Sequence, residues 1–364
     1  MKKFILFAII TLCSFMSNAQ LTTLADGGSV KALVSERVGI TDVTINYGRP
    51  AVKGREGKIW GGLVYNGFQN LGPGYGSGND APWRAGANEN TTIEFSTDVM
   101  IEGHQLQSGK YGLFIAYGPA SCTLIFSSNT SSWGSYFYDK KEDVLRVNVK
   151  PVIRTESRER LSYEFSNETD SSATISLVWE KLALPFNVST KLQQLQLASF
   201  DKELRGEKGF DPHALLQAAD YMQEHNIRLN EALTYADNAA MSMPTFGALM
   251  TKGQILEKLN RQAQADSIMK AALEIGSAQE IHNYARSLLG EKKTQKAFDV
   301  FQYNYKRHPN TFTTNVGMSR GYAAIGNKKD AIKYANLALA TAPDPASKKS
   351  VETMIRALME GRDI

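Results

Sequence analysis

The sequence has 364 residues, with 41 lysines and arginines against 37 aspartates and glutamates, and a formal net charge of +4. This balance is nearly neutral, so it gives no support to a nucleic-acid partner, which calls for a strongly basic surface. The length fits two or three domains of ordinary size.

The first twenty residues, MKKFILFAIITLCSFMSNAQ, have the pattern of a secretory signal peptide. Two lysines precede the apolar run Phe4–Met16, and Ser17 and Ala19 are the small residues expected before a cleavage site. The apolar run is too short to span a bilayer, and no later segment is suited to do so. We expect cleavage before Gln20 and export to the periplasm or the medium.

Up to about residue 190, apolar and polar residues alternate with a period of two in short runs bounded by Gly, Asn, Asp or Ser. This pattern is typical of antiparallel strands with one wet face. It predicts a β-sandwich or jelly-roll-like domain over residues 20–190. The inward positions of these runs are Val43, Ile45, Tyr47, Ile93, Phe95, Leu145, Val147, Val149, Leu161, Tyr163, Phe165, Ile175, Leu177 and Trp179.

Cys122 is the one cysteine that remains after the predicted cleavage, so the mature chain can form no internal disulfide. It lies in the apolar run CTLIF, which predicts a buried and unreactive thiol.

After residue 190 the apolar period becomes helical. We expect a linker helix over residues 191–210 and tetratricopeptide-like helical repeats over residues 211–364, an all-α domain. Small residues at a fixed interval let paired helices approach closely, and each pair buries its apolar face by stacking on the next. The repeat is marked by Ala232, Ala265, Ala297 and Ala331, spaced 33, 32 and 34 apart, and by Tyr322, Gly326, Ala338 and Pro343 in the last unit. Two roles remain open for these repeats: a groove for a protein partner, or a buttress for the β-domain.

The stretch between Tyr47 and Glu89 has little strand character and an unusual number of cationic and aromatic side chains. Connections longer than about 15 residues are uncommon unless they bind something. Guanidinium groups suit carboxylate, sulfate or phosphate, and aromatic faces suit sugar rings or cations. We therefore predict a site for an anionic small molecule, a glycan or a peptide terminus. Its candidate residues are Arg49, Arg55, Trp60, Arg84, Asn88 and Glu89, with Trp133, Tyr136 and Tyr138 as walls.

A structural interpretation of the same stretch stays open. In APWRAGANENTTIEFS, residues 81–96, the side chains of Arg84, Asn88 and Glu89 could bond loop carbonyls and one another. Two interpretations of Arg84 and Glu89 therefore remain. They are recognition groups for a ligand, or they form an ion pair that locks the loop.

Several sequence motifs of the β-rich region occur together in one known family. VKGREGKIWGGLV, PWRAGANENTTIEF, SGKYGLF, SSWGSYFYDKKEDVLRVNVKP and LVWEKLALPFNV appear in that order. Over roughly residues 30–190 the chain thereby resembles the family of domain of unknown function 2911. The resemblance implies a secreted or periplasmic β-rich domain, often followed by tetratricopeptide-like helices, and it implies no activity. Compared with many members, this chain carries an insertion, Tyr65–Pro82.

No catalytic or metal-binding set stands out. The five histidines are isolated and have no zinc-site spacing, and the sequence indicates no cofactor. The first hypothesis is therefore a non-catalytic exported binding protein. One alternative is an envelope-acting hydrolase that uses Glu89 with Asp139 or Glu94, since glycoside hydrolysis needs two carboxyl groups across a cleft. A second alternative is a purely structural envelope scaffold.

Overall fold

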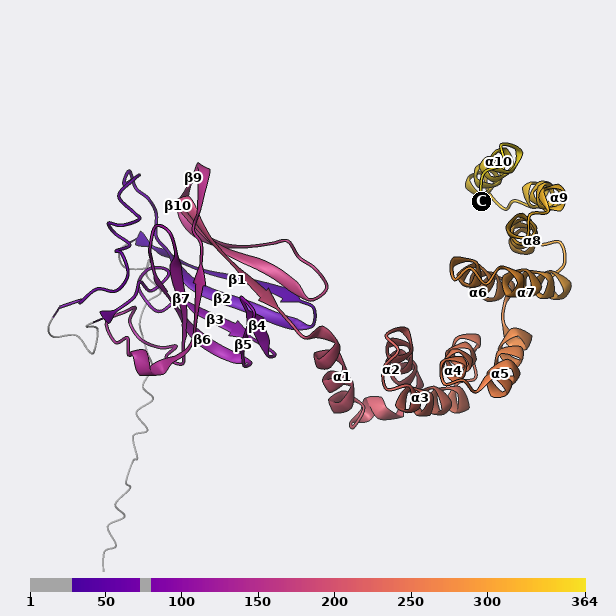
Figure 1. Cartoon of the computed structure of the whole chain (residues 1–364), viewed down its shortest axis with the longest axis horizontal. Coiled ribbons are helices and arrows are strands. Elements are labelled where there is room, and N and C mark those ends of the chain that lie inside the picture. Colours follow the sequence, from indigo (N-terminus) through magenta and orange to yellow (C-terminus); the bar gives the residue numbers. More distant parts are fainter. Residues whose placement is uncertain (1–27, 73–79) are drawn as a thin grey trace, which may run out of the picture. The chain divides into compact units, whose positions relative to one another are not determined.

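The computed structural model describes residues 28–72 and 80–364. The predicted signal peptide, and residues 73–79 of the predicted insertion, lie outside the described residues. The chain forms two compact units that divide between Ala198 and Ser199. The first consists mainly of antiparallel strands and the second of helices, which confirms the predicted fold class (Figure 1).

The larger sheet of the β-domain has six strands in the order β1-β2-β3-β6-β7-β8. All of its neighbouring strands pair antiparallel. Its strands are β1 (Val30–Val38), β2 (Thr41–Arg49), β3 (Thr92–Phe95), β6 (Gly109–Ala116), β7 (Cys122–Ser127) and β8 (Asp143–Val149).

The smaller sheet has four strands in the order β5-β4-β10-β9, also antiparallel. These are β4 (Val99–Ile101), β5 (His104–Leu106), β9 (Val152–Ser166) and β10 (Ser172–Ser189). The register of β9 and β10 shifts on either side of Glu180, where the backbone has a φ of +51°. Such a bulge bends a strand and re-aims the side chain next to it.

One hydrophobic core is shared by the two sheets. Ile45 and Ile93 of the larger sheet and Leu177 of the smaller sheet are almost fully buried in it. Phe95 is also buried, whereas Glu94 between Ile93 and Phe95 is exposed. The alternating pattern therefore predicted the inward face of these strands correctly. Cys122 at the start of β7 is buried and free, as expected.

The helical unit follows β10 through α1 (Leu192–Glu203) and the short 3₁₀ helix η4 (Glu207–Phe210). In chain order, the helices from α2 to α5 pack each on the next, and so do the helices from α6 to α10 (Figure 1). They are α2 (Pro212–Glu224), α3 (Leu229–Ser242), α4 (Phe246–Lys258), α5 (Gln262–Ile275), α6 (Ala278–Gly290), α7 (Thr294–Arg307), α8 (Phe312–Ala324), α9 (Lys328–Ala340) and α10 (Pro345–Met359).

The predicted repeat corresponds to helix pairs, in which α2, α4, α6 and α8 are the first helices and α3, α5, α7 and α9 the second. Ala232, Ala265, Ala297 and Ala331 all lie in second helices, and each has an exposed fraction of 0%. A side chain no larger than a methyl group at these positions allows the two helices of a pair to pack closely. No helix of the described part of the chain is long and apolar enough to cross a membrane.

Candidate functional site

The loop at residues 84–91 is packed against the β-domain through its own backbone. Ala85 and Asn88 adopt left-handed conformations, with φ of +52° and +65°. The hydroxyls of Thr91 and Tyr163 donate to the carbonyl oxygen of Ala85, at 3.2 and 2.9 Å. Gly48 of β2 has no room for a side chain because the carbonyl of Ala87 occupies that space. This loop is therefore a tightly held part of the domain.

Arg84 lies across this loop rather than extending into solvent. Its guanidinium donates to the carbonyl oxygen of Asn88 at 2.7 Å and stacks over the ring of Tyr136, 5.4 Å from the ring centroid. Gly134 packs directly against the same guanidinium, and its φ is +61°. Arg84 thus joins the 84–91 loop to the loop that carries Tyr136.

Glu89 forms its ion pair with a residue of another element. Its carboxylate lies 2.5 Å from the ammonium group of Lys31 on the edge strand β1. The hydrogen bond from Lys31 lowers the pKa of Glu89. Both side chains are well exposed, with 71% of Lys31 and 40% of Glu89 accessible. Arg84 and Glu89 consequently tie the loop at two separate points.

Arg49 and Arg55 both bind backbone carbonyl groups. The Arg49 side chain donates to the carbonyl of Leu161 at 2.8 Å. Arg55 donates to the carbonyls of Val52 and Ala51, at 2.9 and 2.7 Å. Arg49 thus binds the backbone of β9, and Arg55 binds the backbone of the loop to which it belongs.

Trp60 belongs to an aromatic cluster next to the core. Its ring contacts those of Trp83, Tyr117 and Trp179, with centroids 5.7, 5.1 and 6.2 Å away. Its indole N–H donates to the carbonyl of Trp179 at 3.2 Å. Trp83 and Trp179 are buried and Trp60 is partly buried. The cluster joins the loop before β3 to the smaller sheet.

The three predicted walls differ in exposure. Tyr138 is buried, donates to Asp143 at 2.8 Å and accepts a hydrogen bond from Arg146 at 2.7 Å. Burial, together with Asp143, raises the pKa of Tyr138 well above its usual value. Trp133 is 51% exposed, and Phe137, which the sequence did not single out, is 47% exposed. The loop that packs on Arg84 through Gly134 and Tyr136 thus exposes two aromatic side chains, those of Trp133 and Phe137.

The described ends of the Tyr65–Pro82 insertion lie together. The Tyr65 hydroxyl donates to the carbonyl of Ala81 at 2.9 Å, and Gln69 pairs with Ala81 through two backbone hydrogen bonds of 3.0 Å. Burial raises the pKa of Tyr65 to about 12. Leu71 packs against the buried cluster that contains Phe114 of β6. The base of the insertion is therefore fixed to the larger sheet.

The three carboxylates of the hydrolase alternative are Glu89, Asp139 and Glu94, and each has a different environment. Glu89 pairs with Lys31, and Asp139 accepts a hydrogen bond from the backbone N–H of Lys141 at 3.0 Å. Glu94 lies on the exposed face of β3. Within residues 28–72 and 80–364, no group of three or more His, Cys, Asp or Glu side chains is arranged to hold a metal ion.

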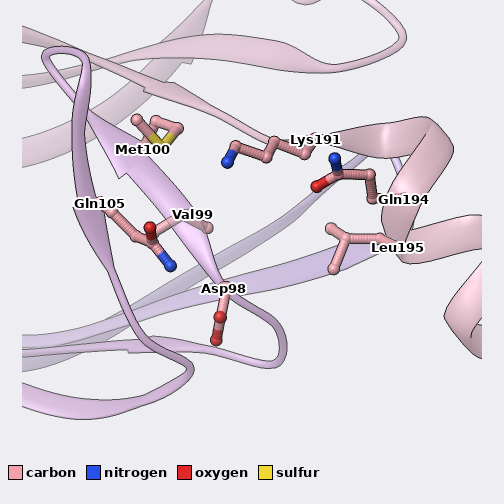
Figure 2. Close-up of a pocket in the computed structure, with 7 residues that line it drawn as sticks. All are labelled: Asp98, Val99, Met100, Gln105, Lys191, Gln194 and Leu195. Atoms are coloured by element: carbon pink, nitrogen blue, oxygen red, sulfur yellow. The ribbon is translucent and has the colours of Figure 1, made fainter.

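A small cleft lies between the β4–β5 hairpin and the start of α1. Figure 2 shows the Lys191 side chain reaching toward β4. The volume of the cleft is about 120 Å³, well below the several hundred Å³ of ordinary ligand pockets. The carboxylate of Asp98 already accepts a hydrogen bond from the backbone of Ser108, at 2.8 Å. None of the residues predicted for the site lines this cleft.

A larger groove crosses three successive first helices of the helical unit. Its volume is about 530 Å³, and it mixes acidic, basic and amide groups with an apolar floor. The helical period predicted the helices but not which of their residues share this groove. The lining residues are Gln223 and Glu224 of α2, Gln254, Glu257 and Lys258 of α4, Tyr284 and Leu288 of α6, and Glu291 and Lys293 of the following turn.

These features define a two-domain protein with an antiparallel β-domain and an all-α domain of helix pairs. Residues 29–188 match the model of the family described as Protein of unknown function (DUF2911). The match begins just before β1 and ends one residue before the last residue of β10, and it confirms the resemblance seen in the sequence. Among curated proteins, none matches this chain.

The helical part is similar to solved structures of tetratricopeptide repeat (TPR) proteins. YrrB, a TPR protein with an unusual peptide-binding site, is 18% identical over 44% of this chain and 83% of its own, with a TM-score of 0.28. TTC0263, a thermophilic TPR protein of Thermus thermophilus, is 18% identical over 46% and 95%, with a TM-score of 0.30. MamA of Desulfovibrio magneticus is 15% identical over 43% and 95%, with a TM-score of 0.26.

Proposed function

We propose that the protein is an exported, non-catalytic binding protein whose helical repeats bind an extended segment of a protein partner. The observation that carries this proposal is the groove over α2, α4 and α6, because side chains from three repeats line one continuous surface. A groove of this kind offers an extended chain both polar groups and an apolar floor, of which Tyr284 and Leu288 are part.

Site-specific photo-crosslinking tests this role. A photoreactive amino acid replaces Gln254 in the groove, or Glu291 at its rim. The matched control replaces Asp299, which is exposed on the second helix α7. We expect both groove positions to crosslink the same protein in the native host and the control position to give no such product. Equal products at all three positions, or none at the groove, would favour the buttress role.

For the β-domain, we propose that the surface formed by Trp133, Phe137 and Arg84 binds a glycan. The support is the exposure of two aromatic side chains on the loop that packs on Arg84. An exposed aromatic side chain offers a ligand a large, rigid apolar surface, and little side-chain conformational entropy is lost on binding. Its flat ring suits the apolar face of a sugar. Arg84 supports this surface and, through its charge, favours a glycan that carries a carboxylate.

Tryptophan fluorescence tests the glycan site directly. Trp133 is well exposed, whereas Trp83 and Trp179 are buried, so acidic oligosaccharides bound at this surface should quench the exposed component. Trp133→Ala should abolish the change. Two outcomes would contradict the proposal. One is quenching that persists in this variant, and the other is the absence of quenching with both neutral and acidic oligosaccharides.

The export proposal is supported by the signal-peptide pattern of residues 1–19. Intact-mass measurement of the protein from its native host tests it. We expect a mature chain that begins at Gln20 and is found outside the cytoplasm. A cytoplasmic chain that retains Phe4–Met16 would contradict export.

A further inference from the structure

Another pocket of the helical unit lies where α3, α4 and α5 meet. Its volume is about 410 Å³, within the range of ordinary small-molecule sites. Its walls come from the two second helices α3 and α5 and from the first helix α4, which lies between them in the chain. It shares no lining residue with the groove over α2, α4 and α6. It is therefore a separate candidate site.

The pocket has an apolar floor. Leu233 of α3 and Leu256 of α4 line it and are buried, and Ile268 of α5 is partly buried. An apolar group that enters such a pocket is stabilised, because the contact removes hydrocarbon surface of both partners from water. The floor thus suits an aliphatic or aromatic ligand body.

The polar groups around this floor are mainly hydrogen-bond donors. Lys252 of α4 and Arg261, the residue before α5, both line the pocket. The Nε–H of Arg261 donates to the Gln264 side chain at 2.7 Å, and Arg261 forms no ion pair with any residue in the described part of the chain. The Ser267 hydroxyl lies on the same wall. A guanidinium and an ammonium group on one pocket suit a carboxylate.

The pocket also contains one carboxylate of the protein, that of Asp237 on α3. Its Oδ1 atom lies 2.9 Å from the ammonium group of Lys252, but without hydrogen-bond geometry, so the N–H groups of Lys252 remain available to a ligand. Asp237 balances the charge of Lys252, and the charge of Arg261 is left uncompensated among the lining residues. A ligand with a single negative charge would neutralise it.

The pocket depends on residues particular to this pair of repeats. Asn260 and Lys292 have nearly the same left-handed φ, +59° and +61°, in the turns before α5 and α7, and they mark equivalent positions 32 residues apart. By this spacing the counterpart of Lys252 is Tyr284, which is buried and donates its hydroxyl to the sulfur of Met269. A buried aromatic ring thus stands where this pocket has a flexible cation, so repeat geometry alone does not account for the pocket.

We propose that this pocket binds a small apolar carboxylic acid. Arg261 and Lys252 bind its carboxylate, and its hydrocarbon body lies on Leu233, Leu256 and Ile268. An aliphatic monocarboxylate such as octanoate has both the charge and the apolar body that these residues call for. The inference is independent of the proposed peptide groove, because the two sites share no residue.

Methyl NMR on residues 20–364, with ¹³C in the δ1 methyl groups of isoleucine, tests the site. The Ile268 signal, assigned through Ile268→Val, reports on the pocket, and the signal of Ile332 on α9 is the control. We expect octanoate to shift the signal of Ile268 and to leave that of Ile332 in place. The affinity should rise about threefold for each added methylene from butyrate through hexanoate to octanoate. Octylamine, which has the same chain length and the opposite charge, should not bind.

Substitutions of the charged residues separate ligand contacts from structural ones. Arg261→Gln should weaken octanoate binding about tenfold, and Arg261→Lys should weaken it less because the charge is kept. Asp237→Asn removes the competing carboxylate of the protein and should tighten binding about threefold. A merely structural role of Asp237 would not produce tighter binding. The matched control is Arg356→Gln on α10, an exposed arginine whose loss should leave the affinity unchanged.

Ser267→Phe fills the pocket without altering a charge, and Ser267 is exposed, so the helix should keep its fold. Far-UV circular dichroism checks the fold, and octanoate binding should fall at least tenfold. Equal shifts with octylamine, an affinity that does not rise with chain length, or unchanged binding in both Arg261→Gln and Ser267→Phe would each overturn the inference. Tighter binding of acetyl-Ala-Ala-Leu with a free C-terminus than of octanoate would overturn it as well, and would assign the pocket to a protein segment.

Discussion

Gly134 and Arg84 are packed so closely that a methyl group on Gly134 would overlap the guanidinium group. Gly134 also has a φ of +61°, a backbone conformation that favours glycine. The two residues belong to different loops, and their contact holds Arg84 between the carbonyl of Asn88 and the ring of Tyr136.

Gly134→Ala should therefore destabilise the β-domain by about 2–4 kcal/mol, because backbone strain and overpacking add. The matched control is Gly54→Ala, since Gly54 has a φ of +71° and nothing within 4 Å of the added carbon. The control should cost about 1 kcal/mol. All four tryptophans lie in the β-domain, so urea unfolding followed by tryptophan fluorescence measures it alone. Equal losses of unfolding free energy in both variants would mean that the Arg84 side chain moves away from residue 134 at little cost.

Arg84 and Glu89 should differ in their effect on stability. Arg84→Ala removes a hydrogen bond and a cation–π contact and should cost about 1–3 kcal/mol. Glu89→Gln breaks an exposed ion pair with Lys31 and should cost less than about 1 kcal/mol. The same fluorescence-detected unfolding compares them. A large loss for Glu89→Gln that is insensitive to salt would contradict the assignment of this pair to the surface.

The helical unit should lose stability as the pH falls because of His282. Its folded pKa of about 4 lies below the ordinary value of 6.5, so the unfolded state binds the proton more tightly. The contribution is complete above pH 6.5 and is lost as the pH falls toward 4, by roughly 3 kcal/mol at most. Far-UV circular dichroism of urea unfolding at pH 7 and pH 5 measures it. His282→Gln should flatten this dependence, and His213→Gln, on the surface of α2, should leave it unchanged.

Two glycines of α4 should respond to alanine in opposite directions. A Cβ on Gly247 would meet nothing within 4 Å, so Gly247→Ala should stabilise the helical unit by about 0.5–1 kcal/mol. A Cβ on Gly253 would lie 2.6 Å from the Cγ of Met269 in α5, so Gly253→Ala should cost about 1–3 kcal/mol. Thermal unfolding followed at 222 nm compares the two. Stabilisation by both would show that Met269 moves aside easily.

The sequence predicted those features that depend on local periodicity. The alternation around Ile93 and Phe95 identified the inward face of β3, and the evenly spaced alanines identified the helical repeat and its length. Both patterns arise because a strand or a helix presents one face to the core, whatever its partner is.

Contacts between distant segments could not be predicted in this way. The partner of Glu89 is Lys31, on a strand that lies 58 residues earlier. The indole of Trp60 bonds the carbonyl of Trp179, 119 residues away. Such pairs depend on the strand order of two sheets, which one sequence does not specify. The left-handed backbone of Ala85 gave no signal either, because alanine rarely adopts it.

The buried carboxylate of Glu180, at the bulge of β10, has a consequence for folding. It accepts a hydrogen bond of 2.5 Å from the backbone of Gly57, which lies 123 residues earlier. The loop around Gly57 is synthesised long before β10, and closing so large a loop is slow because its entropic cost precedes any gain in contacts. We therefore expect the loop that contains Arg55 and Trp60 to become ordered late, because its contact with Glu180 requires β10.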